Sequence, residues 1–156
     1  MAEGAGPRHL TFHPTNKWIY VVNELDCTVS LITQSKDGLY NLETSYSTLP
    51  ENFTDENYCA DIHITSDGKF IYASNRGHNS IVIYEVNQMN GSLKFIGHES
   101  TRGEWPRNFS LSSDDNYLLV ANQHTNNIVS FKRNLATGLL EYIGQIEAPT
   151  PVCILF

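Results

Sequence analysis

A stretch of 25 residues occurs three times in this chain, and this repeat restricts the possible folds more than any other feature. Without gaps, RHLTFHPTNKWIYVVNELDCTVSLI (from Arg8) aligns with ADIHITSDGKFIYASNRGHNSIVIY (from Ala60) and with RNFSLSSDDNYLLVANQHTNNIVSF (from Arg107). A fourth copy begins at Pro151. The chain is therefore expected to be built from one supersecondary unit of about 45 to 50 residues.

Each unit contains four stretches with the composition of β-strands, and no stretch shows a helical period. Short alternating or continuous apolar runs are separated by turn residues, and a hairpin signal ending in glycine precedes each last strand. The expected strands are 10–12, 18–22, 28–33 and 40–45 in the first unit, 62–64, 70–73, 80–86 and 93–98 in the second, and 117–121, 127–132 and 139–145 in the third.

Repeated four-stranded antiparallel units of this length predict an all-β fold made of β-propeller blades. A β-sandwich or an open β-solenoid is the alternative. The expected blades are residues 7–50, 59–103 and 106–150, with a closing strand at 151–156. Because propellers typically need about four to eight blades to close, we expect the chain to be part of a longer protein or one arc of a self-associated assembly.

The composition restricts the partners. A formal charge of −7 and a pI near 5.2 argue against nucleic acid or an anionic membrane. No run approaches the ~20 apolar residues of a membrane span. Cys27, Cys59 and Cys153 form neither a CxxC motif nor an even set, which favours interior thiols in a cytoplasmic protein. No metal-ligand spacing, Gly-rich phosphate loop or GxSxG motif is present, so no cofactor is expected.

Polar residues recur where the first strand of each unit begins and the second strand ends. These two points are neighbours in an antiparallel pair, so they should meet on one rim near the central channel. Arginine suits recognition of carboxylate or phosphate. The rim is therefore predicted to bind a small anionic ligand. The residues placed there are Arg8, His9 and Glu24 in the first unit, Asp61 and Arg76 in the second, and Arg107, Asn108 and Gln123 in the third.

The motifs GAGPRHLTFHP, YVVNE, ADIHITSDGKFIYASNRGHNSI and PRNFSLSSDDNYLLVANQHTNNI resemble the lactonase family of seven-bladed propellers over nearly the whole chain. That family includes propeller-type 6-phosphogluconolactonases and carboxymuconate lactonizing enzymes. The resemblance implies the C-terminal three and a half blades of such a propeller. By motif, it implies site roles for Arg8, Glu24 and Arg76, together with a histidine from an N-terminal half that has no counterpart here.

A lactonase mechanism is expected to use these groups together. Glu24 would activate water, and Arg8 or Arg76 would hold the anionic group and stabilise the oxyanion. His9 or His63 would protonate the leaving oxygen, while Arg107, Asp61, Gln123, Asn108 and His78 would bind substrate. A muconate-type cyclase and a non-catalytic scaffold that binds a protein or peptide are the alternative functions.

Each candidate also has a purely structural explanation. Arg8–Glu24 and Asp61–Arg76 are potential cross-strand ion pairs, and His63 is a potential interior histidine. His124, like His78, lies in the loop after a second strand on the predicted rim and is a candidate for ligand contact. The insertion 50–57 between the first two units is expected on the same rim, as a pocket wall or a solvated loop.

Overall fold

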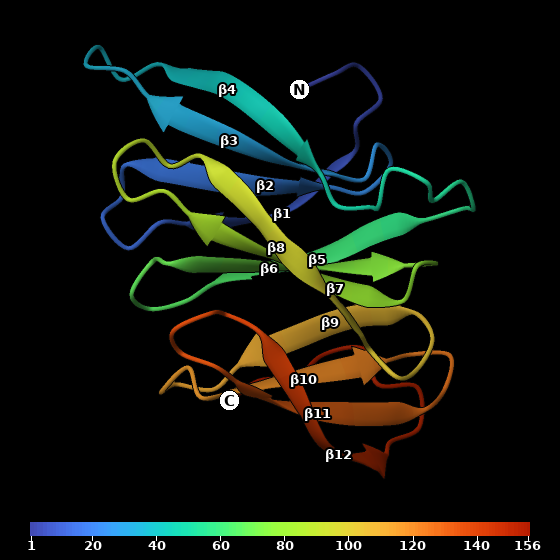
Figure 1. Cartoon of the computed structure of the whole chain (residues 1–156). Helices are drawn as coiled ribbons and strands as arrows, with labels where there is room; N and C mark the ends of the chain where they lie inside the picture. Colours follow the sequence, from blue (N-terminus) through green and yellow to red (C-terminus); the bar gives the residue numbers. More distant parts are fainter.

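The computed structural model describes residues 1–156 and contains twelve strands and no helix (Figure 1). The predicted all-β propeller-blade fold is confirmed. The strands are β1 (Pro7–Phe12), β2 (Trp18–Asn23), β3 (Thr28–Gln34), β4 (Tyr40–Ser47), β5 (Tyr58–Ile64), β6 (Phe70–Arg76), β7 (Ser80–Val86), β8 (Leu93–Ser100), β9 (Pro106–Leu111), β10 (Tyr117–Asn122), β11 (Asn127–Arg133) and β12 (Leu140–Glu147). The chain has no helix of the length and apolar character needed to cross a membrane.

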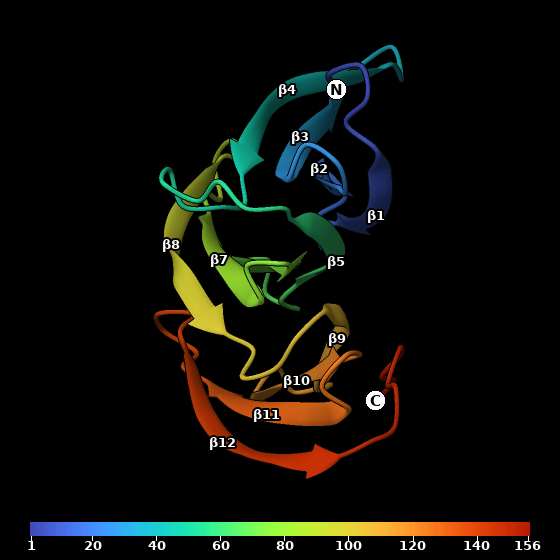
Figure 2. The same ribbon diagram turned by 90° about the vertical axis from the view of Figure 1, so that its right-hand side faces the viewer.

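The strands form three four-stranded antiparallel sheets whose spatial order follows the sequence: β1-β2-β3-β4, β5-β6-β7-β8 and β9-β10-β11-β12. The sheets stack face to face as successive blades. Figure 2 shows the first strands β1, β5 and β9 along one side and the last strands β4, β8 and β12 along the other. Because β1 contacts β5 and β5 contacts β9, the first strands form the inner side of an arc.

The hydrophobic core lies between the blades. One cluster joins the first and second blades, with Tyr20 and Val22 packed against residues such as Ile71. A second cluster joins the second and third blades around Phe109 and Phe131. Strand β6 is buried along its whole length, because sheets cover both of its faces. This burial explains why the second strands have continuous apolar runs rather than strict alternation.

At each interface between two blades, a hairpin glycine of one blade contacts two aromatic residues of the other. Gly91, with φ 74°, lies so close to Trp18 that a Cβ atom would be 2.5 Å from Cδ2 of the indole. The hydroxyl of Tyr20 donates to the carbonyl oxygen of the same glycine at 2.9 Å. Phe70, Tyr72 and Gly138 repeat this arrangement between the next two blades. The hairpin glycines are thus interface residues as well as turn residues.

The end of the chain differs from expectation. The repeat predicts a closing strand at 151–156, but these residues form none, and Cys153 is exposed rather than interior. The segment lies beside β9, where the amide of Ile154 donates to Oδ1 of Asn108 at 2.6 Å. A single side-chain contact does not provide the backbone ladder that defines a strand. Cys27 and Cys59, by contrast, are buried as expected.

The insertion 50–57 crosses the predicted rim between β4 and β5. Its last residue, Asn57, is buried and accepts the amide hydrogen of His78 at 3.0 Å. The ring of Phe53 contacts His78 edge-on, with centroids 4.9 Å apart. The remaining residues of the insertion are mostly exposed. The segment is therefore a surface loop anchored at two points.

Candidate functional site

A β-bulge at the start of the first strand recurs in all three blades. Pairing passes from Pro7 to His9 in β1, from Cys59 to Ile62 in β5, and from Pro106 to Asn108 in β9. Each first strand therefore has at least one residue with no partner on the second strand. Such a bulge changes the direction of the neighbouring side chains. The bulges contain Arg8, Ala60 with Asp61, and Arg107. They turn these positions toward the inner edge of the arc.

Glu24 lies between two arginines. Its Oε2 is 3.5 Å from Nε of Arg8, and its Oε1 accepts a hydrogen bond from Nη2 of Arg76 on the next blade. The cross-strand pair of Arg8 with Glu24 is thus present, and a second pair links the blades. Arg8 also donates to the carbonyl oxygen of Ala60. A single carboxylate therefore organises two guanidinium groups from different sheets.

The arginines carry positive charge beyond what the carboxylates nearby offset. Burial lowers the pKa of Arg8, the charge of Arg76 lowers it further, Glu24 raises it, and Arg107 lowers it again. No hydrogen bond in the chain engages the guanidinium of Arg107, although the residue is partly buried. An anion placed among the three guanidinium groups would relieve this repulsion.

Two aromatic rings hold Arg76, and the sequence pattern indicates neither of them. The guanidinium carbon of Arg76 lies 5.2 Å from the ring centroid of Trp105 and 6.0 Å from that of Tyr58, within cation–π range. Nε and Nη2 donate to the carbonyl oxygens of Tyr58 and Cys59 at 3.3 and 2.9 Å. His124 stacks on Trp105 with centroids 4.8 Å apart. The one available signal in the sequence is the position of Trp105 directly before the bulge of β9.

Asp61 is a buried hub beside this cluster. Its Oδ1 lies 2.8 Å from Nδ1 of His9, and its Oδ2 lies 3.3 Å from Nε2 of His63. The amide of Asn108 donates to the same carboxylate, as do the backbone N–H groups of Ile62 and Phe109. The expected alternative pair of Asp61 with Arg76 is not formed, because Arg76 reaches across to Glu24 instead.

Two other candidates lie outside the cluster of Arg8, Glu24 and Arg76. The ring of His78 packs between Phe53 and His98, with centroids 4.9 and 5.1 Å away. Burial, together with the charge of His98, lowers the pKa of His78. Gln123 follows β10 at the predicted rim, and its buried Oε1 has no hydrogen-bond partner. Neither residue hydrogen-bonds to the arginines.

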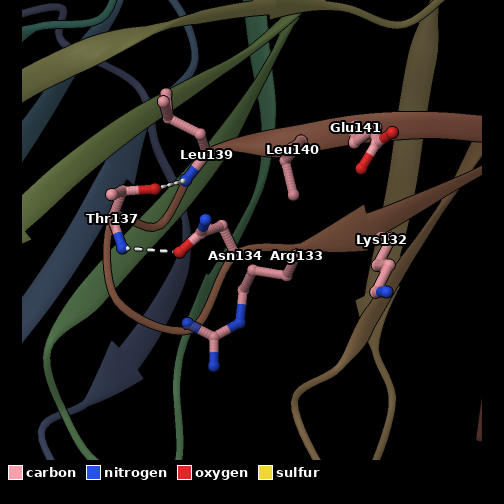
Figure 3. A pocket seen from close by; sticks show the side chains of 7 residues that line it. All are labelled: Lys132, Arg133, Asn134, Thr137, Leu139, Leu140 and Glu141. Carbon is pink, nitrogen blue, oxygen red and sulfur yellow. Dashed lines mark hydrogen bonds between the residues drawn. The ribbon is translucent and has the colours of Figure 1, made fainter.

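A pocket lies away from this cluster. It has a volume of about 320 Å³ and is lined by residues of the β11–β12 hairpin, from Lys132 to Glu141 (Figure 3). Thr137 and Asn134 hydrogen-bond within the turn at 3.1 Å. Strand β11 starts at the candidate rim, where Asn127 pairs with Asn122, and ends at this hairpin. The pocket is therefore at the opposite end of the blade from the candidate site.

The hydrogen bonds of Asp61 predict that the free energy of unfolding depends on pH. Burial alone would raise the pKa of Asp61, but the hydrogen bonds and charges of His63 and His9 outweigh it and lower the pKa to about 2 from 3.8. A depressed carboxyl pKa stabilises the folded state above the unfolded pKa, and this stabilisation disappears as the pH falls from about 5 to about 2. For this nearly buried group, the shift corresponds to about 2 kcal/mol.

We therefore expect the difference in free energy of unfolding between the wild type and Asp61→Asn to shrink by about 2 kcal/mol between about pH 6 and about pH 2. Urea unfolding at each pH measures it. Asp55→Asn, on the exposed insertion, is the control. A difference that is independent of pH would contradict the assigned role of the carboxylate.

Comparison with known proteins places this geometry in a family. The family model described as "Lactonase, 7-bladed beta-propeller" matches residues 1–156. A 6-phosphogluconolactonase of Bacillus subtilis is 45% identical over 109 residues, and one of Formosa agariphila is 48% identical over 112 residues. In both cases the match covers 69% of this chain and 31% of the relative, so the chain spans about a third of the curated relatives' length.

Solved structures show the same fold. The periplasmic gluconolactonase of Pseudomonas aeruginosa has a TM-score of 0.92 at 28% identity, covering 97% of this chain and 42% of that one. A structure described as a putative 6-phosphogluconolactonase from Bacteroides fragilis has a TM-score of 0.87 at 39% identity. The match covers 96% of this chain and 41% of that one. The three blades thus superpose on less than half of each longer propeller.

Proposed function

This chain belongs to the lactonase family of seven-bladed β-propellers, and we propose that the whole protein that carries it hydrolyses a sugar-acid lactone with an anionic substituent, such as 6-phosphogluconolactone. The curated relatives that carry the name 6-phosphogluconolactonase support this substrate class. A small phosphorylated lactone is the partner that the proposal requires.

The observation that carries the proposal is the arginine cluster on the inner edge of the arc. Arg8, Arg76 and Arg107 come from three different blades, and Glu24 is the carboxylate that pairs with the first two. The chain as a whole is acidic, with a formal charge of −7, so this concentration of positive charge is local. A phosphate presents several oxygens to planar guanidinium donors, and such charge-assisted bonds are strong.

We assign binding and transition-state stabilisation to the arginines. One guanidinium group would hold the phosphate, and another would face the ring carbonyl oxygen as negative charge develops on it. Glu24 keeps Arg8 and Arg76 at fixed positions, so little reorganisation is needed when substrate arrives. This role differs from the expected activation of water, because both carboxylate oxygens of Glu24 already face arginines.

The test compares three substrates with the whole protein: 6-phosphogluconolactone, unphosphorylated gluconolactone and a carboxymuconate. We expect the phosphorylated lactone to be hydrolysed with a kcat/KM at least about tenfold above that of its neutral counterpart, because a charged substituent gains about 1.5 to 3 kcal/mol from a charge-assisted hydrogen bond. The spontaneous hydrolysis rate is subtracted. Faster turnover of the carboxymuconate would favour the cyclase instead, and no turnover of any substrate would favour a binding scaffold.

A further inference from the structure

We propose that His9 carries the proton in the lactone hydrolysis and that Asp61 is the residue that positions it. The assignment rests on the proposed function and goes beyond it, since it names the proton-transfer group. It also changes the expected role of Asp61, from contacting substrate to orienting a histidine.

The carboxylate of Asp61 is held in one place by groups from two blades. Its side chain is only 5% exposed. The backbone N–H of Ile62 donates to Oδ1 at 3.0 Å, and the N–H of Phe109 on the next blade donates to Oδ2 at 3.3 Å. Asn108 donates its amide to Oδ2 as well. A buried carboxylate with this many donors stays ionised and keeps its position.

An ionised carboxylate accepts hydrogen bonds and cannot donate one, which determines the tautomer of His9. Nδ1 of His9, 2.8 Å from Oδ1 of Asp61, must carry the hydrogen. In the neutral ring, Nε2 then has the acceptor lone pair, and it accepts a hydrogen bond from Arg8. Nε2 lies 3.3 Å from Nη1 of Arg8, at the arginine cluster, and 46% of the side chain is exposed. A basic nitrogen thus faces the position where Arg8 would hold the substrate.

Neither alternative group is placed as well. Both oxygens of Glu24 pair with guanidinium groups, and these ion pairs hold Arg8 and Arg76 in place. His63 uses Nε2 to reach Asp61 at the longer distance of 3.3 Å, and its ring packs edge-on against Phe109 with centroids 4.8 Å apart. It makes no hydrogen bond to an arginine. His9 alone combines a contact to the Asp61 carboxylate with a second ring nitrogen that contacts Arg8.

In the proposed reaction, His9 acts first as a general base and then as a general acid. Nε2 of His9 takes a proton from water while the water oxygen bonds to the lactone carbonyl carbon. The tetrahedral oxyanion faces the arginines. As it collapses, the ring C–O bond breaks, and the imidazolium gives the same proton to the departing oxygen. One water is consumed, and a hydroxy acid is formed without an oxidant or cofactor.

The test uses the whole protein with 6-phosphogluconolactone. We expect His9→Ala to lower kcat about 100-fold with KM changed less than threefold, because general acid–base catalysis contributes at least about that factor. Added imidazole should restore at least a tenth of the lost rate, with saturation. Asp61→Asn should lower kcat about tenfold or more, and His63→Ala, the matched control on the same carboxylate, should lower it less than fivefold.

Thermal unfolding verifies that each variant is folded. His9 is the decisive position because its half-exposed ring can be removed without opening the core. A His9→Ala variant with more than a third of the wild-type kcat, or one that imidazole does not rescue, would overturn the assignment while leaving the lactonase function intact. A wild-type protein without lactonase activity would instead overturn the proposed function, and this assignment with it.

Discussion

Replacing Glu24 by glutamine is expected to lower kcat/KM for the phosphorylated lactone by about 100- to 1,000-fold. The amide oxygen of glutamine can accept from one guanidinium only, and its NH2 group would face the other. Arg8 and Arg76 then lose the charge that holds them together and repel each other. Steady-state kinetics of the whole protein measures the loss.

The fold should survive this change, since glutamine has nearly the same shape and the Glu24 side chain is about a third exposed. Glu104→Gln is the matched control. Glu104 is an exposed carboxylate in the loop before β9, and no arginine pairs with it. Activity of Glu24→Gln within threefold of wild type would show that the Arg8–Glu24–Arg76 arrangement is structural only.

The largest expected effect on stability is that of Gly91→Ala, which should cost about 3 kcal/mol. A residue with a Cβ is strained at the φ of 74° found there. The added methyl would also overlap the indole of Trp18, 2.5 Å from the nearest ring atom, so the two blades must move apart. This separation would weaken the hydrogen bond from Tyr20 to the carbonyl oxygen of residue 91. Urea unfolding of the whole protein measures the change.

The Gly38→Ala variant separates backbone strain from steric overlap. Gly38 occupies the equivalent turn of the first blade with φ 85°, but a Cβ added there would be 4.0 Å from its nearest neighbouring atom. It should therefore cost only the backbone strain of about 1 to 2 kcal/mol. Equal losses for the two variants would mean that the glycines serve the turn alone and do not determine how the blades pack.

Part of the candidate site could be predicted, because adjacent strands of one blade bring its residues together. Arg8 and Glu24 come together through the pairing of adjacent antiparallel strands, which the repeat alone locates. Trp105 was not predicted, since its ring reaches Arg76 only through the path of the loop between β8 and β9. The surroundings of His78 were not predicted for a related reason. His78 follows the rim strand in sequence, but its ring packs against Phe53 of the insertion 50–57, and its backbone N–H donates to Asn57.

The four-stranded units and the positions of most strands follow from the sequence, because turn residues and apolar runs act within a few residues of one another. The sequence also determined which residue types gather on one rim. The partners of these side chains follow from the way the blades pack. Arg76 reaches Glu24, and His9 reaches Asp61, across 52 residues. These contacts depend on how one blade is rotated against the next and on a local bulge, and neither leaves a periodic pattern in the chain.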